Sequence, residues 1–440
     1  MPEGSEYERM NSPMNQFQTR EERGIYVHVL PTDKFRMNTI VATFTQELRE
    51  ETATPLAVLP YLLNRGSERY PTPEKLQLAL DELYGASLSA IIDKKGERQV
   101  VDFSMNVPNE KFLKQGEGLF KKALGILSDV MLRPRLEDGA FLPEYVQAEK
   151  EQHKKRLAAV IDDKIVYAGE RCIQEMTKGE PFAIPRLGYE ERIDEITPQS
   201  LYAVYQELLK TAPIHIYVIG DVEIDQVVQD IFSVFNMERD PQLHFQAVQV
   251  QHETHEVKEV VERLAINQGK LNIGVWSNVA WESDDYAAMH VCNGVLGAFP
   301  HSKLFVNVRE KHSLAYYCMS RLEGHKGIIS VYAGVEFDKI DQAVDIIREQ
   351  FETIKKGDIS AEEMEFTISA LINAYKTAMD TPTSFADFHL NGLIAGRVRT
   401  REEMIEAFQK VTVEDVVRVA QGLQFDTIYT LRNEEGNHGA

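Results

Sequence analysis

Apolar residues recur in two kinds of pattern along the chain, and they predict an ordered series of strands and helices. Runs rich in β-branched residues predict strands over 25–31 and 38–48. Segment 55–67, "PLAVLPYLLNRGS", is apolar on most faces of a helix and should be buried, with Pro60 kinking it or lying in its first turn. Segment 72–85 predicts an amphipathic helix. The rest of this half predicts strands over 87–93, 98–107 and 214–222 and helices over 109–131, 140–162 and 197–210.

The stretch 236–262 is polar and has no helical periodicity, which is typical of an interdomain linker. Beyond it the same order of elements begins again. Strands are expected over 270–278, 327–335 and 427–433, and helices over 284–298, 338–356, 360–379 and 412–423.

This repetition can be checked by register. Residues 76–107, moved along by 228 positions, fall on 304–335 without a gap; Leu76 then coincides with Leu304 and Gly96 with Gly324. The matched apolar phase predicts two copies of one unit. The expected fold class is α+β, with two homologous α/β sandwich-like domains, each a mixed sheet covered by helices.

Four segments follow from this reading of the chain. A flexible N-terminal tail is expected over 1–21, a first domain over 22–235, the linker over 236–262 and a second domain over 263–440. The length of 440 residues suits two domains of roughly 200 residues each.

Composition narrows the class of protein. The net charge of −21 argues against nucleic-acid binding, which needs a basic surface. It leaves open an acidic chamber for basic peptides or simply a well-solvated surface. No apolar run approaches the roughly 18 residues of a membrane span, and the N-terminus does not resemble a secretory signal. Three widely spaced cysteines imply no set of disulfides and favour a reducing cytoplasm.

Several common catalytic motifs are missing from the sequence. It contains no GxxxxGK[ST], GxSxG or CxxC motif. The "HETHE" stretch (252–256) looks like a metal motif, but its residues are in the wrong order and lie in the polar linker. His252 and His255 therefore need not share a face. The other histidines are scattered, and no pair is spaced i, i+4 around a carboxylate.

The stretches "NGVLG" and "SKLFVNVREKHSLAYY" in the second half carry a resemblance to a known family. They are similar to the C-terminal half of the insulinase/pitrilysin peptidases, the inverzincins. In those enzymes a first-half helix carries HxxEH, whose two His residues bind zinc and whose Glu activates water. The resemblance implies a duplication like that of the mitochondrial processing peptidase. It also implies that an Arg and a Tyr, seven residues apart, grip the substrate and its oxyanion; Arg309 and Tyr316 have that spacing.

The zinc motif itself is lost here. Aligning "LLNRGS" with the family places HxxEH on residues 57–61, where Ala57 and Tyr61 replace the histidines and Pro60 replaces the Glu. The distal-helix stretch "YVQAEKEQHKKRL" puts Glu149 at an acidic position and Arg156 at the zinc-Glu position. The resemblance is therefore to a non-catalytic member that lacks HxxEH, and no metal is expected on this chain.

Some family members work as two chains that share one site. The resemblance implies that this chain supplies Arg309 and Tyr316 in trans to a zinc-bearing homologous peptidase subunit, the zinc being held by that partner. Their substrate would be a peptide or an unfolded protein. In the first half Asp81 stands where Arg309 does and Leu88 where Tyr316 does, so the pair is an addition to the shared scaffold. Read without the resemblance, an Arg at a helix end and a Tyr on a strand are ordinary.

Two other functions remain open on the sequence. One is a structural or peptide-binding scaffold of the same fold. The other is an independent hydrolase with a different metal arrangement, for which the sequence offers no cluster of ligands.

Overall fold

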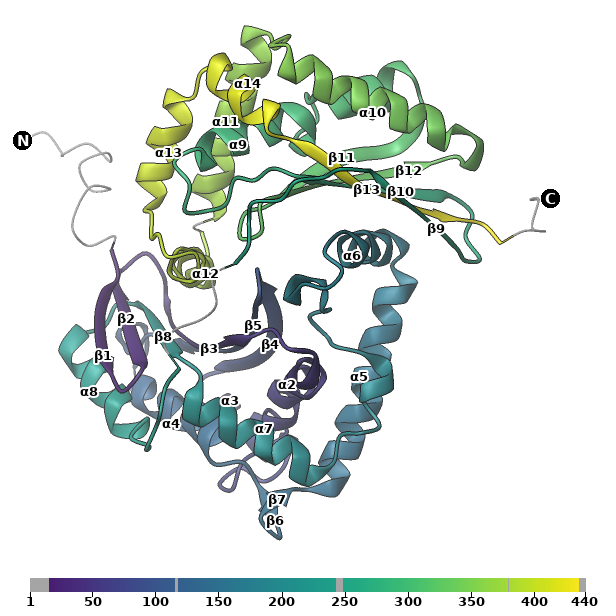
Figure 1. Cartoon of the computed structure of the whole chain (residues 1–440). Helices are drawn as coiled ribbons and strands as arrows, with labels where there is room; N and C mark the ends of the chain where they lie inside the picture. The colour runs from purple at the N-terminus through teal and green to yellow at the C-terminus, as the bar shows by residue number, and fades with distance from the viewer. Residues whose placement is uncertain (1–15, 115–117, 243–247, 379, 435–440) are drawn as a thin grey trace, which may run out of the picture. The chain divides into compact units, whose positions relative to one another are not determined.

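The computed structural model describes residues 16–114, 118–242, 248–378 and 380–434 (Figure 1). These residues form two compact units. The first comprises the described residues within 16–157, 184–242 and 381–387, and the second those within 158–183, 248–378 and 388–434. No helix in the described residues is both long enough and apolar enough to cross a membrane.

The first unit is built around a six-stranded sheet in the order β1-β2-β8-β3-β5-β4. Its strands are β1 (Gln18–Glu22), β2 (Ile25–Pro31), β3 (Met37–Glu47), β4 (Ser87–Lys95), β5 (Arg98–Pro108) and β8 (Ile214–Gly220). Its helices are α2 (Glu50–Leu63), α3 (Pro73–Asp81), α4 (Leu119–Leu132), α5 (Pro143–Asp162), which continues past 157, α7 (Pro198–Thr211) and α8 (Ile224–Val234). A small hairpin, β6 (Leu136–Glu137) and β7 (Ala140–Phe141), and the 3-10 turns Glu110–Phe112 and Glu190–Arg192 complete it.

Alternation along the strands explains why helices cover one face of this sheet. On β5 the side chains of Val101, Phe103 and Met105 are buried, and α2 and α4 pack on this strand. The opposite face carries polar cross-strand pairs, in which Thr43 donates to Asp102 at 2.5 Å. Burial raises the pKa of the Asp102 carboxyl to about 6.

The second unit is built around a five-stranded sheet in the order β11-β12-β10-β13-β9. Its strands are β9 (Lys258–Arg263), β10 (Gly269–Trp276), β11 (Ala315–Glu323), β12 (Ile328–Val335) and β13 (Gln424–Arg432). Its helices are α6 (Lys164–Met176), α9 (Tyr286–Asn293), α10 (Ile340–Lys355), α11 (Ala361–Ala378), α12 (Pro382–Ile394), which belongs to this unit from 388 on, α13 (Arg401–Lys410) and α14 (Val413–Gln421). Two π-helices, Gly294–Ala298 and Phe305–Lys311, and the 3-10 turns Pro181–Ala183 and Phe337–Lys339 lie between them.

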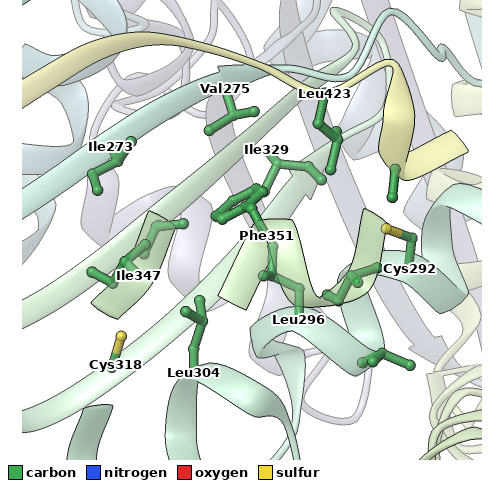
Figure 2. Close-up of a cluster of buried hydrophobic side chains, with 14 of the residues drawn as sticks. Ile273, Val275, Cys292, Leu296, Leu304, Cys318, Ile329, Ile347, Phe351 and Leu423 are labelled. Atoms are coloured by element: carbon green, nitrogen blue, oxygen red, sulfur yellow. The ribbon is translucent and has the colours of Figure 1, made fainter. Parts of the chain in front are cut away.

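The core of this unit lies between the sheet and the helices on one of its faces. Ile273 and Val275 of β10, Phe351 of α10 and Leu296 of the first π-helix belong to one buried apolar cluster, which Figure 2 shows. Helix α6 packs on the other face of the sheet, against β10 and β13. The sheet is therefore covered on both faces where α6 crosses it.

The two sheets share one topology, which confirms the predicted fold class. β2-β8-β3-β5-β4 and β9-β13-β10-β12-β11 have the same order, with one parallel pair (β2 with β8, β9 with β13) followed by antiparallel pairs. β4 begins at Ser87 and β11 at Ala315, and 315 − 87 gives the offset of 228 that the sequence predicted. The hairpins differ, because Lys95 pairs with Arg98 in the first and Glu323 with Ile328 in the second.

Several predicted boundaries were wrong. The predicted tail, 1–21, ends in strand β1, whose residues pair with β2; residues 1–15 lie outside the described part. The predicted linker, 236–262, ends in β9, which pairs in parallel with β13, and the described part resumes at 248. The predicted first domain, 22–235, contains segment 158–183, which packs in the second unit instead. Helices α6, α8, α12 and α13 were not predicted.

Candidate functional site

Arg309 lies on a helix of unusual geometry. Residues Phe305–Lys311 form a π-helix, and the guanidinium carbon of Arg309 stands 4.6 Å from the centre of the Phe305 ring. The side chain is exposed, and it has no hydrogen-bond or ion-pair partner among the described residues. Isolated π-turns are rare in proteins and occur frequently at functional sites.

Tyr316 lies on an irregular part of β11. Ala315 pairs with Val335 and Tyr317 with Gly334, so Tyr316 is the extra residue of a β-bulge. Its side chain is 77% exposed, and its hydroxyl has no partner in the part of the chain that the structure describes. A bulge changes the direction of a side chain and leaves its residue unpaired, so the regular strand pairing is interrupted at Tyr316.

The equivalent positions of the first unit show what the scaffold needs. Asp81 ends α3, an ordinary α-helix, and Leu88 pairs with Met105 in an uninterrupted ladder. The π-helix and the bulge are thus found in the second copy at the two positions where Arg309 and Tyr316 stand. The two copies differ in backbone geometry as well as in side chain.

An exposed turn that ends at the buried Leu314 connects the two residues. The N–H of Leu314 donates to the carbonyl of Val308 at 3.1 Å, and Leu314 is 5% exposed. Ser313 has a φ of 50°, the left-handed region that a non-glycine residue rarely adopts. Burial raises the pKa of the neighbouring Tyr317 to about 12, so this phenol is neutral near pH 7. Lys311 and His312 are exposed.

The lost zinc motif lies on α2 of the first unit. Ala57 is fully buried with Val58 and Leu59, and Pro60 is also buried. Pro60 lies inside the helix rather than in its first turn, because α2 begins five residues earlier than predicted, at Glu50. Tyr61 is half-buried.

Arg156 of α5 lies against Tyr61. Its guanidinium carbon is 3.7 Å from the centre of the Tyr61 ring, a cation–π distance. Its Nη2 donates to Glu149 Oε2 at 3.0 Å, and Nε of Arg65 donates to Glu149 Oε1 at 2.6 Å. The structure thus brings Tyr61 and Arg156, two of the degenerate positions, together around a buried carboxylate.

These residues do not fit a zinc ion. Alanine, proline and tyrosine at 57, 60 and 61 replace the family's two imidazoles and carboxylate, and the guanidinium of Arg156 places a positive charge beside them. Across the described residues no group of three or more His, Cys, Asp or Glu side chains is arranged to hold a metal.

The "HETHE" stretch belongs to an irregular segment of the second unit. The His252 ring stacks on Trp276 with centres 3.6 Å apart, whereas His255 is exposed. Nδ1 of His252 lies 3.9 Å from Glu180, which also pairs with the fully buried Lys326 at 2.5 Å. His252 therefore packs against the second sheet, and we assign it no ligand role.

Sequence reasoning missed two contacts of these sites. Arg65 lies just beyond the end of α2, and its contact is with Glu149 of α5, which is distant in the sequence. Phe305 precedes Arg309 by four residues, a spacing that brings two side chains together on a helix and could have suggested this contact.

Comparison with known proteins identifies the family to which the chain belongs. A family model described as "Peptidase M16 inactive domain" matches residues 195–371. The "Probable inactive metalloprotease YmfF" of Bacillus subtilis is 38% identical over 415 residues, covering 94% of this chain and 97% of that protein. The chain belongs to the insulinase/pitrilysin (M16) peptidase family. It is similar to YmfF over nearly its whole length, and its sequence lacks HxxEH.

Solved structures of other proteins share this fold. A conserved protein from Enterococcus faecalis V583 matches with a TM-score of 0.90 and 30% identity, covering 96% of this chain and all of that one. A protease from Helicobacter pylori matches with a TM-score of 0.77 at 15% identity, over 95% of this chain and 99% of that one. The second likeness concerns the fold alone.

Proposed function

We propose that this chain is the non-zinc subunit of a heterodimeric M16 metallopeptidase. It supplies Arg309 and Tyr316 in trans to a homologous partner that carries HxxEH and the zinc ion, and the substrate is a peptide or an unfolded protein. One observation carries the proposal. The side chains of Arg309 and Tyr316 are exposed hydrogen-bond donors without partners in the described residues. Both lie where the backbone of the second unit is irregular, on a π-helix and in a β-bulge.

The chemistry of the two side chains suits these roles. A guanidinium presents a rigid fork of N–H donors, which can hold a peptide carbonyl in one orientation. A neutral phenol can donate its proton to the oxyanion of a tetrahedral intermediate. Such donors contribute most when a partner covers them and excludes water, because the local dielectric then falls.

The test is reconstitution with the zinc-bearing homologous subunit. Tyr316→Phe removes one hydroxyl and should lower kcat by about 10²–10³-fold, with assembly of the two chains unchanged. Lys311→Gln is the matched control. Lys311 is an exposed residue of the π-helix that carries Arg309, and its Nζ donates to Asn307, so this change should leave kcat unchanged. Unchanged turnover in Tyr316→Phe would disprove the role in trans. Metal analysis that finds one zinc per isolated chain would disprove the division of labour.

A scaffold without a part in the reaction is the alternative function. The 77% exposure of Tyr316 also suits a protein contact, since tyrosine is enriched at interfaces. In that case Arg309→Ala would weaken assembly and leave the turnover of the assembled enzyme unchanged.

We place this activity in the cytoplasm. Cys172, Cys292 and Cys318 are all free and buried, and burial raises the pKa of each thiol to about 12. Such thiols are unreactive and suit a reducing compartment.

A further inference from the structure

The cluster at the lost zinc motif carries more positive charge than its own carboxylate balances. Arg65 and Arg156 share Glu149, whose side chain is 6% exposed, so two cations meet one anion. Each guanidinium is about a quarter exposed, at 25% for Arg65 and 27% for Arg156. The group has a net charge of +1 on a chain whose net charge is −21.

Several N–H donors of the two guanidiniums have no acceptor among the described residues. Arg65 engages Glu149 through Nε, and its two terminal nitrogens have no partner among the described residues. Arg156 engages Glu149 through Nη2, while its Nη1 is buried and has no acceptor in the described part of the chain. A buried charged donor without an acceptor is costly, and native structures rarely keep one without a reason.

The neighbours hold these donors in place without neutralising them. The Tyr61 ring lies under Arg156, and the Tyr145 ring lies 5.8 Å from Arg65. His153, one turn from Arg156 on α5, donates from Nε2 to the carbonyl of Leu187, and burial lowers its pKa. The imidazole is therefore neutral near pH 7 and adds no charge.

We propose that Arg65 and Arg156 form an anion site that takes a carboxylate of a bound peptide. This rests on the proposed function, and it deepens that function by naming a chemical feature of the substrate. A guanidinium fork matches a carboxylate with two parallel N–H···O bonds, and partial burial strengthens them. The overall negative charge of the chain opposes acidic ligands at long range, so a preference for them has to come from a local site such as this one.

The test measures binding of four labelled peptides to the full-length chain by fluorescence anisotropy. The peptides share one sequence; they end in a free carboxylate or an amide, and carry Glu or Gln at one internal position. We expect a peptide with a carboxylate to bind about 10–100-fold more tightly than its neutral counterpart, the range for a charge-assisted bidentate contact. The four arms show whether the carboxylate is the C-terminal one or a side chain.

Variants decide whether the cluster causes this preference. Arg156→Gln should reduce the acid-to-neutral ratio to near one and leave the affinity of the neutral peptide unchanged. Arg156→Lys keeps the charge but loses the fork, and should retain part of the ratio. Arg171→Gln is the control: this Arg is 31% exposed, pairs with Glu262 and Glu175, and belongs to the second unit.

Either of two results would refute the proposed anion site. If the wild-type ratio is near one, or if Arg156→Gln keeps the full ratio, then the cluster only fixes α2 to α5. That failure is separate from failure of the proposed function, because the Tyr316→Phe turnover assay does not depend on Arg156.

Discussion

Neutralising Glu149 should destabilise the first unit. Glu149 is 4% exposed and accepts two charge-assisted bonds, at 2.6 Å from Arg65 and 3.0 Å from Arg156. In Glu149→Gln one amide oxygen remains, and the new NH₂ group faces a guanidinium. Each charged bond contributes about 1.5–3 kcal/mol, and partial exposure of both arginines reduces this. We expect a loss of about 2–4 kcal/mol, which lowers the urea midpoint by about 1–2 M.

The positions of the tryptophans provide the assay. Trp276 and Trp281 both belong to the second unit, so their fluorescence reports unfolding there, whereas far-ultraviolet circular dichroism reports both units. Glu149→Gln should move the dichroism transition further than the fluorescence transition. Glu406→Gln is the control, since Glu406 and Lys410 form an ion pair whose side chains are 68% and 78% exposed, and this change should alter stability by less than about 0.5 kcal/mol. An unchanged dichroism midpoint in Glu149→Gln would refute the reasoning.

Three further predictions follow from buried groups and from glycines. The pKa of the Asp102 carboxyl is raised from 3.8 to about 6, so the folded state favours the neutral acid and loses stability as pH rises from about 4 to above 6. Asn cannot ionise, so the stability of Asp102→Asn relative to wild type should increase by up to about 3 kcal/mol between pH 4 and pH 7. Urea unfolding at each pH measures this difference. Glu180→Gln removes the charged partner of the fully buried Lys326, whose Nζ also donates to the carbonyl of Gln249, and should cost about 3–5 kcal/mol, measured by tryptophan fluorescence. Gly66→Ala would place a Cβ 2.5 Å from a backbone oxygen and should lower Tm more than Gly85→Ala, which meets nothing within 4 Å, although both glycines have positive φ.

Each of these has a contrary result. A constant stability difference between Asp102→Asn and wild type across that pH range would mean that the carboxyl titrates normally in the fold. A Glu180→Gln protein as stable as wild type would mean that neutral acceptors, such as the carbonyl of Gln249, satisfy the buried Lys326. Equal Tm values for the two alanine variants would mean that strained φ, rather than the clash, decides the cost.

The candidate site was predicted in part. Arg309 and Tyr316 could be named because a short motif fixes their spacing, and the duplication supplied Asp81 and Leu88 for comparison. The π-helix and the bulge could not be predicted, because such irregularities depend on how the strand pairs with β12 and on what the helix packs against. Arg65 escaped notice for a similar reason, since its partner Glu149 lies 84 residues away.

The sequence by itself determined the order of most strands and helices, the two copies of the unit and the loss of HxxEH. A segment with one buried face shows a regular spacing of apolar residues, and the absence of a histidine can be read directly from the sequence. The tertiary structure decided which sheet each segment joins. β9 is polar and largely exposed, so it carries no period, and its place is set by its hydrogen bonds to β13. Helix α6 is amphipathic, but nothing local says that its apolar face covers β10 and β13, because a hydrophobic stripe specifies burial and not the partner that buries it.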